Sequence, residues 1–113
     1  LVSADLFDFH PAPTPEADAL EFYLFALRRE RVAQVGWLDE KYTFYRNLDL
    51  DWSLAFRDKG LRLLAVPGLP LTAHEHPYYR LDPVERDQLS RRNYRRFLKR
   101  WGERRDLLLS SAR

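Results

Sequence analysis

The segment from residue 82 to residue 105 constrains the fold most, because its helical pattern is long and has a clear start. Asp82 precedes Pro83, a pair typical of a helix N-cap and first turn, and Glu85 occupies the third helical position. We therefore expect one long helix over residues 83–105, ended or kinked at Gly102. One side of this helix carries an apolar stripe that consists of Leu89, Tyr94, Phe97, Leu98 and Trp101. This stripe must pack on the body of the chain or on a partner.

Length and composition restrict the class of protein. The chain has 113 residues, 45% of them hydrophobic and 32% charged, which suits one globular domain. The absence of cysteine excludes a disulfide framework and a cysteine nucleophile, and favours a reducing, cytoplasmic compartment. No apolar run is long enough to span a membrane. Because there is no methionine, we expect a trimmed product or a piece of a longer chain.

Charge divides the chain into an acidic body and a basic tail. Residues 1–76 carry a net charge of −4 and residues 77–113 a net charge of +6. Such a tail suits an anionic partner such as an acidic membrane surface, although composition favours the simpler explanation of a solvated helix face. Nucleic acid is a weaker expectation, because the aromatic residues lie on the apolar stripe and not among the basic residues.

The remaining pattern predicts an α/β fold with strands of mixed direction, a short helix with an acidic start and the long basic C-terminal helix. Three regions follow: a proline-rich extended lead-in over residues 1–17, a body over residues 18–76 and a helical tail over residues 77–113. Within the body we expect strands over residues 19–27, 61–66 and 69–74, and helices over residues 28–35 and 48–59, which are ended by Gly36 and Gly60.

Two pairs of side chains could carry chemistry. Asp49 and Asp51 stand at the start of the expected helix over residues 48–59, where one can cap the helix while the other projects into a cleft as a base. Alternatively, both simply complement the helix dipole, which the spacing alone favours. His74 and His76 would point to one side of a strand, as a metal pair does, or would be ordinary surface histidines. The four glycines are scattered and form no phosphate-binding loop.

The order of these elements resembles the second half of the inverting family 2 glycosyltransferases, which have the GT-A fold. The resemblance covers about residues 19–109 and rests on several short motifs in the family's order. They are Gly36-Trp37-Leu38-Asp39-Glu40, Asp49-Leu50-Asp51-Trp52-Ser53-Leu54, Gly60, Val66-Pro67 and His74.

The resemblance implies a partial GT-A-like sheet and a role for each motif. Asp49 matches the base that deprotonates the acceptor hydroxyl, and His74, or alternatively His76, a ligand of the divalent metal, Mg or Mn, on the donor diphosphate. It also implies that four residues lie at the acceptor site, namely Asp39, Glu40, Asp51 and Trp52.

The family's nucleotide-binding half, with its D-x-D motif, is not in this sequence. We therefore expect the C-terminal portion of a nucleotide-sugar-dependent transferase, inactive alone, acting on a glycan or lipid acceptor at the inner membrane face. Two other readings stay open. The chain could be a non-catalytic module that self-associates through its C-terminal helix, or a basic-helix binder of anionic membrane or nucleic acid.

Overall fold

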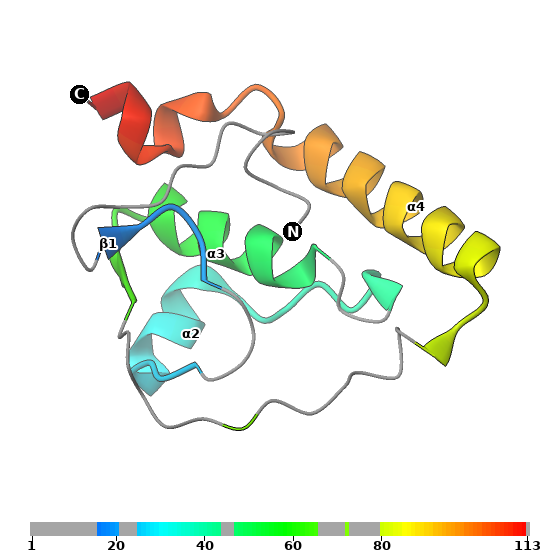
Figure 1. Cartoon of the computed structure of the whole chain (residues 1–113). Helices are drawn as coiled ribbons and strands as arrows, with labels where there is room; N and C mark the ends of the chain where they lie inside the picture. Colours follow the sequence, from blue (N-terminus) through cyan, green and yellow to red (C-terminus); the bar gives the residue numbers. More distant parts are fainter. Residues whose placement is uncertain (1–15, 21–24, 44–46, 66–71, 73–79, 113) are drawn as a thin grey trace.

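The computed structural model describes residues 16–20, 25–43, 47–65, 72 and 80–112. Over these residues the chain is a mixed α/β structure with a small antiparallel sheet, in which β1 (Glu16–Ala17) pairs with β2 (Leu63–Leu64). Three α-helices are α2 (Arg29–Val35), α3 (Leu48–Asp58) and α4 (Pro83–Trp101), and the 3-10 helices η3 (Arg105–Leu107) and η4 (Leu109–Ala112) follow. In Figure 1, α3 lies centrally, with α4 along one side and α2 on the other.

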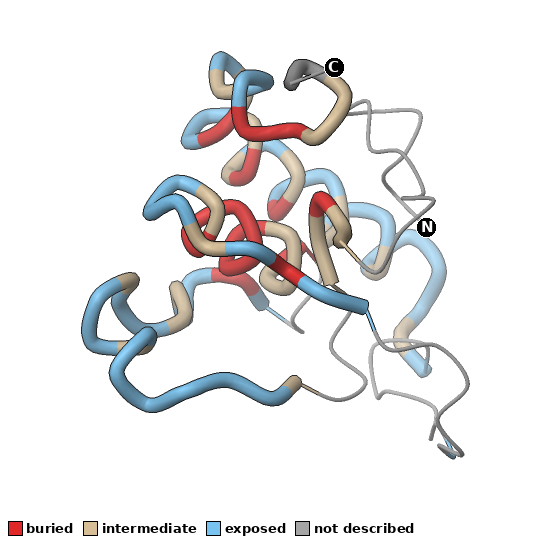
Figure 2. Tube along the Cα trace, turned by 90° about the vertical axis from the view of Figure 1, so that its left-hand side faces the viewer, coloured by how far each residue is buried: buried red, intermediate tan, exposed pale blue. Residues whose placement is uncertain are grey.

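Helix α3 forms the centre of the hydrophobic core. Every residue from 51 to 56 is buried, so this helix is covered on more than the single face that its apolar spacing predicts. Leu54 packs with Phe97 and Trp101 of α4 in the same core cluster, and Leu107 and Leu108 join them from the C-terminal segment. Figure 2 shows this concentration of buried residues along α3 and its neighbours. Each fully buried large apolar side chain contributes about 1.5–3 kcal/mol.

The end of α3 is a Schellman motif, as the position of Gly60 predicts. Gly60 has a φ of 78°, and its N–H donates to the carbonyl of Arg57 at 2.9 Å. The N–H of Leu61 donates to the carbonyl of Phe56 at 3.1 Å. This pair of hydrogen bonds satisfies two helix-end carbonyls and needs a left-handed residue, which glycine adopts without strain.

Helix α4 begins as predicted and ends at Trp101, just before Gly102, the residue predicted to end or kink it. Asp82 caps it, with Oδ2 accepting from the N–H groups of Val84 at 3.0 Å and Glu85 at 3.3 Å. The helix stops at Trp101, and the chain turns at Gly102 instead of continuing to residue 105. The turn brings Leu107 and Leu108 back into the core, where they are 9% and 2% exposed, which a continued straight helix would prevent.

The prediction of a strand over residues 19–27 is wrong for its described part, since residues 19, 20 and 25–27 form no strand. The backbone N–H of Leu20 donates to a side chain instead of to a neighbouring strand, namely to Oγ of Ser53 on α3 at 3.1 Å. Of the segment predicted over residues 61–66, residues 61–65 are described and only Leu63–Leu64 is strand. The strand predicted over residues 69–74 lies outside the described residues, apart from Thr72.

None of the described helices is long and apolar enough to cross a membrane.

Candidate functional site

The first turn of α3 places the two aspartates of the predicted site in different surroundings. Asp49 is half-buried, and its Oδ1 accepts from the N–H of Leu50 at 2.9 Å. Asp51 is 1% exposed and lies on the side of α3 that faces α4. The two carboxylates of this sequence motif, Asp49 and Asp51, therefore differ in how accessible they are to a ligand.

Asp51 is held by donors from three other side chains. Its Oδ1 accepts from Nε1 of Trp101 at 2.8 Å and from the hydroxyl of Tyr42 at 3.3 Å. Nη1 of Arg100 lies 3.1 Å from Oδ2 and 3.2 Å from Oδ1. Such charge-assisted hydrogen bonds compensate for the burial of a carboxylate. This geometry favours a role for Asp51 in fixing α4 and Tyr42 on α3, and contact of Asp51 with an acceptor stays a prediction.

Tyr42 keeps its proton in this network. Burial, together with the charge of Asp51 and the hydrogen bond to it, raises the pKa of the Tyr42 phenol far above its usual range. The hydroxyl is therefore a donor to Asp51 at any physiological pH. The Tyr42 ring also lies below the guanidinium of Arg96, at 6.0 Å from its central carbon.

Trp52 joins the turn over residues 36–40 to α3. Its indole Nε1 donates to the carbonyl of Gly36 at 3.0 Å. Its ring stacks on Phe25 at 5.8 Å and meets Trp37 edge-on at 6.0 Å between centroids. Trp52 is 6% exposed whereas Trp37 is 68% exposed, so the predicted acceptor residue is a buried support and its neighbour carries the accessible indole.

The same turn places Asp39 and Glu40. The Oδ1 atom of Asp39 accepts from the N–H of Lys41 at 3.0 Å. The backbone carbonyl of Asp39 accepts from the N–H of Tyr42 at 3.3 Å. Asp39 is half-buried and Glu40 is exposed. Because Tyr42 reaches Asp51 and Trp52 reaches Gly36, the turn is fixed to α3 from both of its ends. The structure thus attaches the segment that carries Asp39 and Glu40 to α3, and the roles of these two residues at an acceptor site stay predictions.

Asn47, the residue before α3, is an unusual start for a helix. It has a left-handed conformation with a φ of 67° and is 2% exposed. Neither Oδ1 nor Nδ2 of its side chain has a hydrogen-bond partner. Unpaired buried amides and left-handed non-glycine residues both cost free energy and gather at functional sites in proteins. This residue, two positions before Asp49, was not a candidate from the sequence.

The predicted metal ligands His74 and His76 lie outside the described residues. In the part of the chain that is described, no three metal-ligating side chains come together. Both oxygens of Asp51 already accept hydrogen bonds from protein donors, so this carboxylate is a poor ligand. The metal site predicted at His74 and His76 therefore stays a prediction.

The outer face of α4 carries the basic residues noted in the sequence, whereas its apolar stripe is turned inward. Phe97 and Trp101 are buried against α3, at 0% and 3% exposure. Arg92, Arg95 and Lys99 are exposed, and none of them pairs with a carboxylate of the described residues. Association with an anionic membrane surface and self-association through this helix stay predictions.

Sequence reasoning missed the partners of Asp51, because Tyr42, Arg100 and Trp101 are distant from it in the sequence or lie in another predicted element. A partial signal existed for Trp101, since a buried indole N–H needs an acceptor.

No family model, curated protein or solved structure matches this chain in the comparisons with known proteins.

Proposed function

We propose that these residues are the acceptor-side part of an inverting, nucleotide-sugar-dependent glycosyltransferase, with Asp49 as the general base. The observation that carries the proposal is the contrast between the two aspartates of α3. Asp51 is 1% exposed and occupied by donors from other elements, whereas Asp49 is half-buried in the first turn of the same helix. A base needs both a rigid support and access to its substrate, and the partial exposure of Asp49 on a helix with a buried centre supports this role.

The proposed chemistry is a single displacement. The Asp49 carboxylate takes the proton of an acceptor hydroxyl while the oxygen attacks the anomeric carbon of the donor sugar. The bond from that carbon to the nucleoside diphosphate breaks, and the diphosphate leaves with the bonding electrons. Because attack and departure occur on opposite sides, the configuration at the anomeric carbon is inverted.

Three features of the segment that Trp52 joins to α3 support the proposal of an acceptor site. The half-buried Asp39 and the exposed Glu40 offer carboxylate oxygens to sugar hydroxyls. The exposed indole of Trp37 offers an apolar face to the C–H side of a sugar ring. The nucleotide-binding part of the enzyme, and the metal implied by the family resemblance, belong to the proposal through that resemblance alone.

The test is sugar transfer by the full natural protein, assayed with a panel of nucleotide-sugars and glycan or lipid acceptors. We expect a product of inverted anomeric configuration by NMR, and a kcat lowered at least about 100-fold in Asp49→Asn, the range for loss of a general base. Asp87→Asn removes a carboxylate on the exposed face of α4, and it serves as the control with unchanged kcat. Full activity in Asp49→Asn, or a product of retained configuration, would overturn the proposal.

A further inference from the structure

A hollow lies beside the C-terminal end of α3, away from Asp49. Its volume is about 370 Å³, within the range of small-molecule sites. The walls are mainly apolar and come from the segment before α2, from α3 and from the segment of β2, with Phe25, Phe56, Leu61 and Leu63 among them. Phe56 follows Asp49 by two helical turns, about 10 Å along the axis, so the hollow lies away from the proposed base, although Phe25 in its wall stacks on Trp52.

Two exposed leucines open onto this hollow. Leu27 is 39% exposed and Leu64 is 51% exposed, and both line it. Only two other large hydrophobic side chains are this exposed in the described part of the chain, Trp37 and Val84. Exposed apolar side chains that gather around a concavity mark a place where an apolar group is buried on binding.

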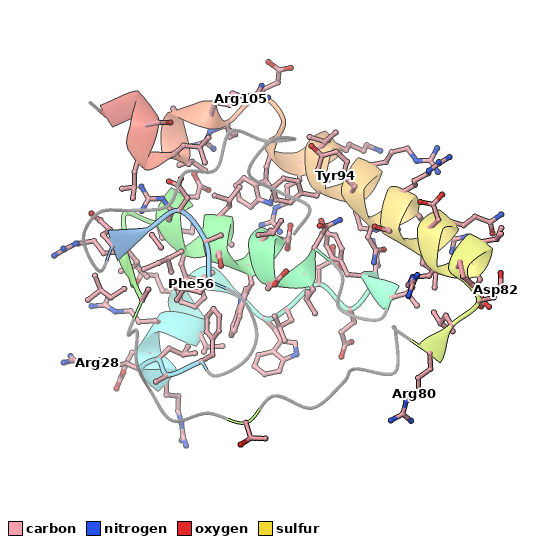
Figure 3. The ribbon with its side chains drawn as sticks, in the orientation of Figure 1. Arg28, Phe56, Arg80, Asp82, Tyr94 and Arg105 are labelled. Atoms are coloured by element: carbon pink, nitrogen blue, oxygen red, sulfur yellow. The ribbon has the colours of Figure 1, made fainter. Side chains whose placement is uncertain are left out.

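Three arginines also line the hollow, and no carboxylate of the described residues does. Arg62 has a partner, with Nε 3.3 Å from Oε1 of Glu16, but its side chain is 70% exposed. The side chain of Arg31 donates to a neutral group, Oε1 of Gln34 at 3.1 Å, and neither Arg31 nor Arg28 pairs with a described carboxylate. In Figure 3, Phe56 lies in the interior beside α3 and Arg28 at the outer edge beside α2. Arg28 and Arg31 thus border an apolar interior, and neither pairs with a carboxylate among the described residues.

We propose that this hollow binds one anionic amphiphile, a molecule with a hydrocarbon chain and a phosphate or carboxylate head group. The hydrocarbon chain of the ligand lies against Phe56 and the two exposed leucines, and its head group pairs with Arg28 and Arg31. Guanidinium groups form paired hydrogen bonds with both phosphate and carboxylate, which explains their preference for these head groups. A second protein is a poorer fit, because a stable interface buries about 800 Å² on each partner, whereas this feature is a small concavity.

The first experiment measures the affinity of the full natural protein for dodecyl phosphate below its micelle concentration, by calorimetry. We expect one molecule bound per chain, and at least tenfold weaker binding in the double variant Arg28→Gln, Arg31→Gln. The matched control is Arg92→Gln, Arg95→Gln, which removes the same charge from the outer face of α4. We expect the control to change the affinity less than twofold. Equal weakening in both double variants would attribute binding to surface charge and overturn the proposal.

A second set of probes tests the hydrocarbon chain and the source of the ligand. Inorganic phosphate should bind at least tenfold more weakly than dodecyl phosphate, and Leu64→Gln should reduce this difference. Binding to phosphatidylglycerol vesicles without binding to monomeric dodecyl phosphate would mean that the protein recognises a membrane surface, and would overturn the pocket. The inference does not depend on the proposed transferase activity, because Asp49→Asn should bind dodecyl phosphate like the natural protein.

Discussion

Nη1 of Arg100 lies 3.1 Å from Oδ2 of Asp51, so a half-exposed guanidinium on α4 neutralises a carboxylate that is buried in α3. The central guanidinium carbon of Arg100 also lies 4.4 Å from the ring centre of Trp101, whose indole N–H donates to the same carboxylate. The basic helix and the helix of the candidate base are therefore joined through one carboxylate. Its removal leaves two buried donors, the Tyr42 hydroxyl and Nε1 of Trp101, without this acceptor.

The first prediction compares the two aspartates of α3. Asp51→Ala should lower the free energy of unfolding by about 3–5 kcal/mol, the usual effect of removing one partner of a buried ion pair. Asp49→Ala should lower it by less than about 1 kcal/mol, the size of a favourable charge at a helix N-terminus. Urea unfolding followed by circular dichroism measures both. Equal losses in the two variants would contradict the structural role given to Asp51.

The second prediction concerns Tyr42 and alkaline pH. Its pKa is higher in the folded state than in the unfolded state because of burial and Asp51, so its contribution to stability is complete below about pH 10. Above that pH the unfolded state loses the phenolic proton and the folded state keeps it, so stability falls by up to about 1.4 kcal/mol per pH unit.

Tyr42→Phe provides the comparison for this pH dependence. The stability advantage of the natural protein over Tyr42→Phe should be constant between pH 7 and pH 9, and should shrink as the pH rises above 10. Denaturant unfolding at each pH measures the difference between the two proteins, which removes the titration of the other tyrosines and lysines. A constant difference up to pH 11 would show that Tyr42 ionises normally.

The sequence predicts local features of this fold better than distant pairings. Asp82 and Gly60 act where the pattern places them, because a cap and a Schellman turn depend on a few adjacent residues. The strand expected over residues 19–27 fails in its described part for a non-local reason. A strand needs a second strand beside it, and Leu20 instead bonds the side chain of Ser53.

In the candidate site, too, the local features could be predicted from the sequence and the distant contacts could not. The start of α3 at Leu48 follows from local pattern, and with it the helical position of Asp49. The burial of Asp51 depends on Arg100 and Trp101, which approach it only once α4 has packed. Spacing within residues 48–59 carries no information about a partner about fifty positions away. The two aspartates therefore look equivalent in the sequence and differ in the structure.

The third prediction isolates backbone strain at Gly60. A Cβ atom at this position would meet no atom within 4 Å, so the φ of 78° alone makes a side chain unfavourable. Gly60→Ala should destabilise the protein by about 1 kcal/mol, since left-handed backbone costs an alanine roughly 1–2 kcal/mol. Lys59→Ala, one residue earlier with a φ of −90°, is the control and should have little effect. Thermal unfolding of both variants distinguishes strain from general disturbance of the helix end.

The last prediction uses two ion pairs of similar length and different burial. Arg100 and Asp51 approach to 3.1 Å with the carboxylate side chain 2% exposed, whereas Arg91 and Asp87 approach to 3.0 Å with side chains 75% and 58% exposed. A double-mutant cycle with alanine at residues 51 and 100 should give a coupling energy of about 1–3 kcal/mol. The same cycle at residues 87 and 91 should give about 0.2–0.5 kcal/mol, because water screens an exposed helical pair.

Ionic strength separates the two pairs further. Raising the salt concentration to 1 M shortens the screening length to about 3 Å and should remove the coupling of the exposed pair. The Arg100–Asp51 coupling should decrease less, since water reaches only the arginine side of that pair. If both couplings were small and equally sensitive to salt, Asp51 would not hold α4 on α3.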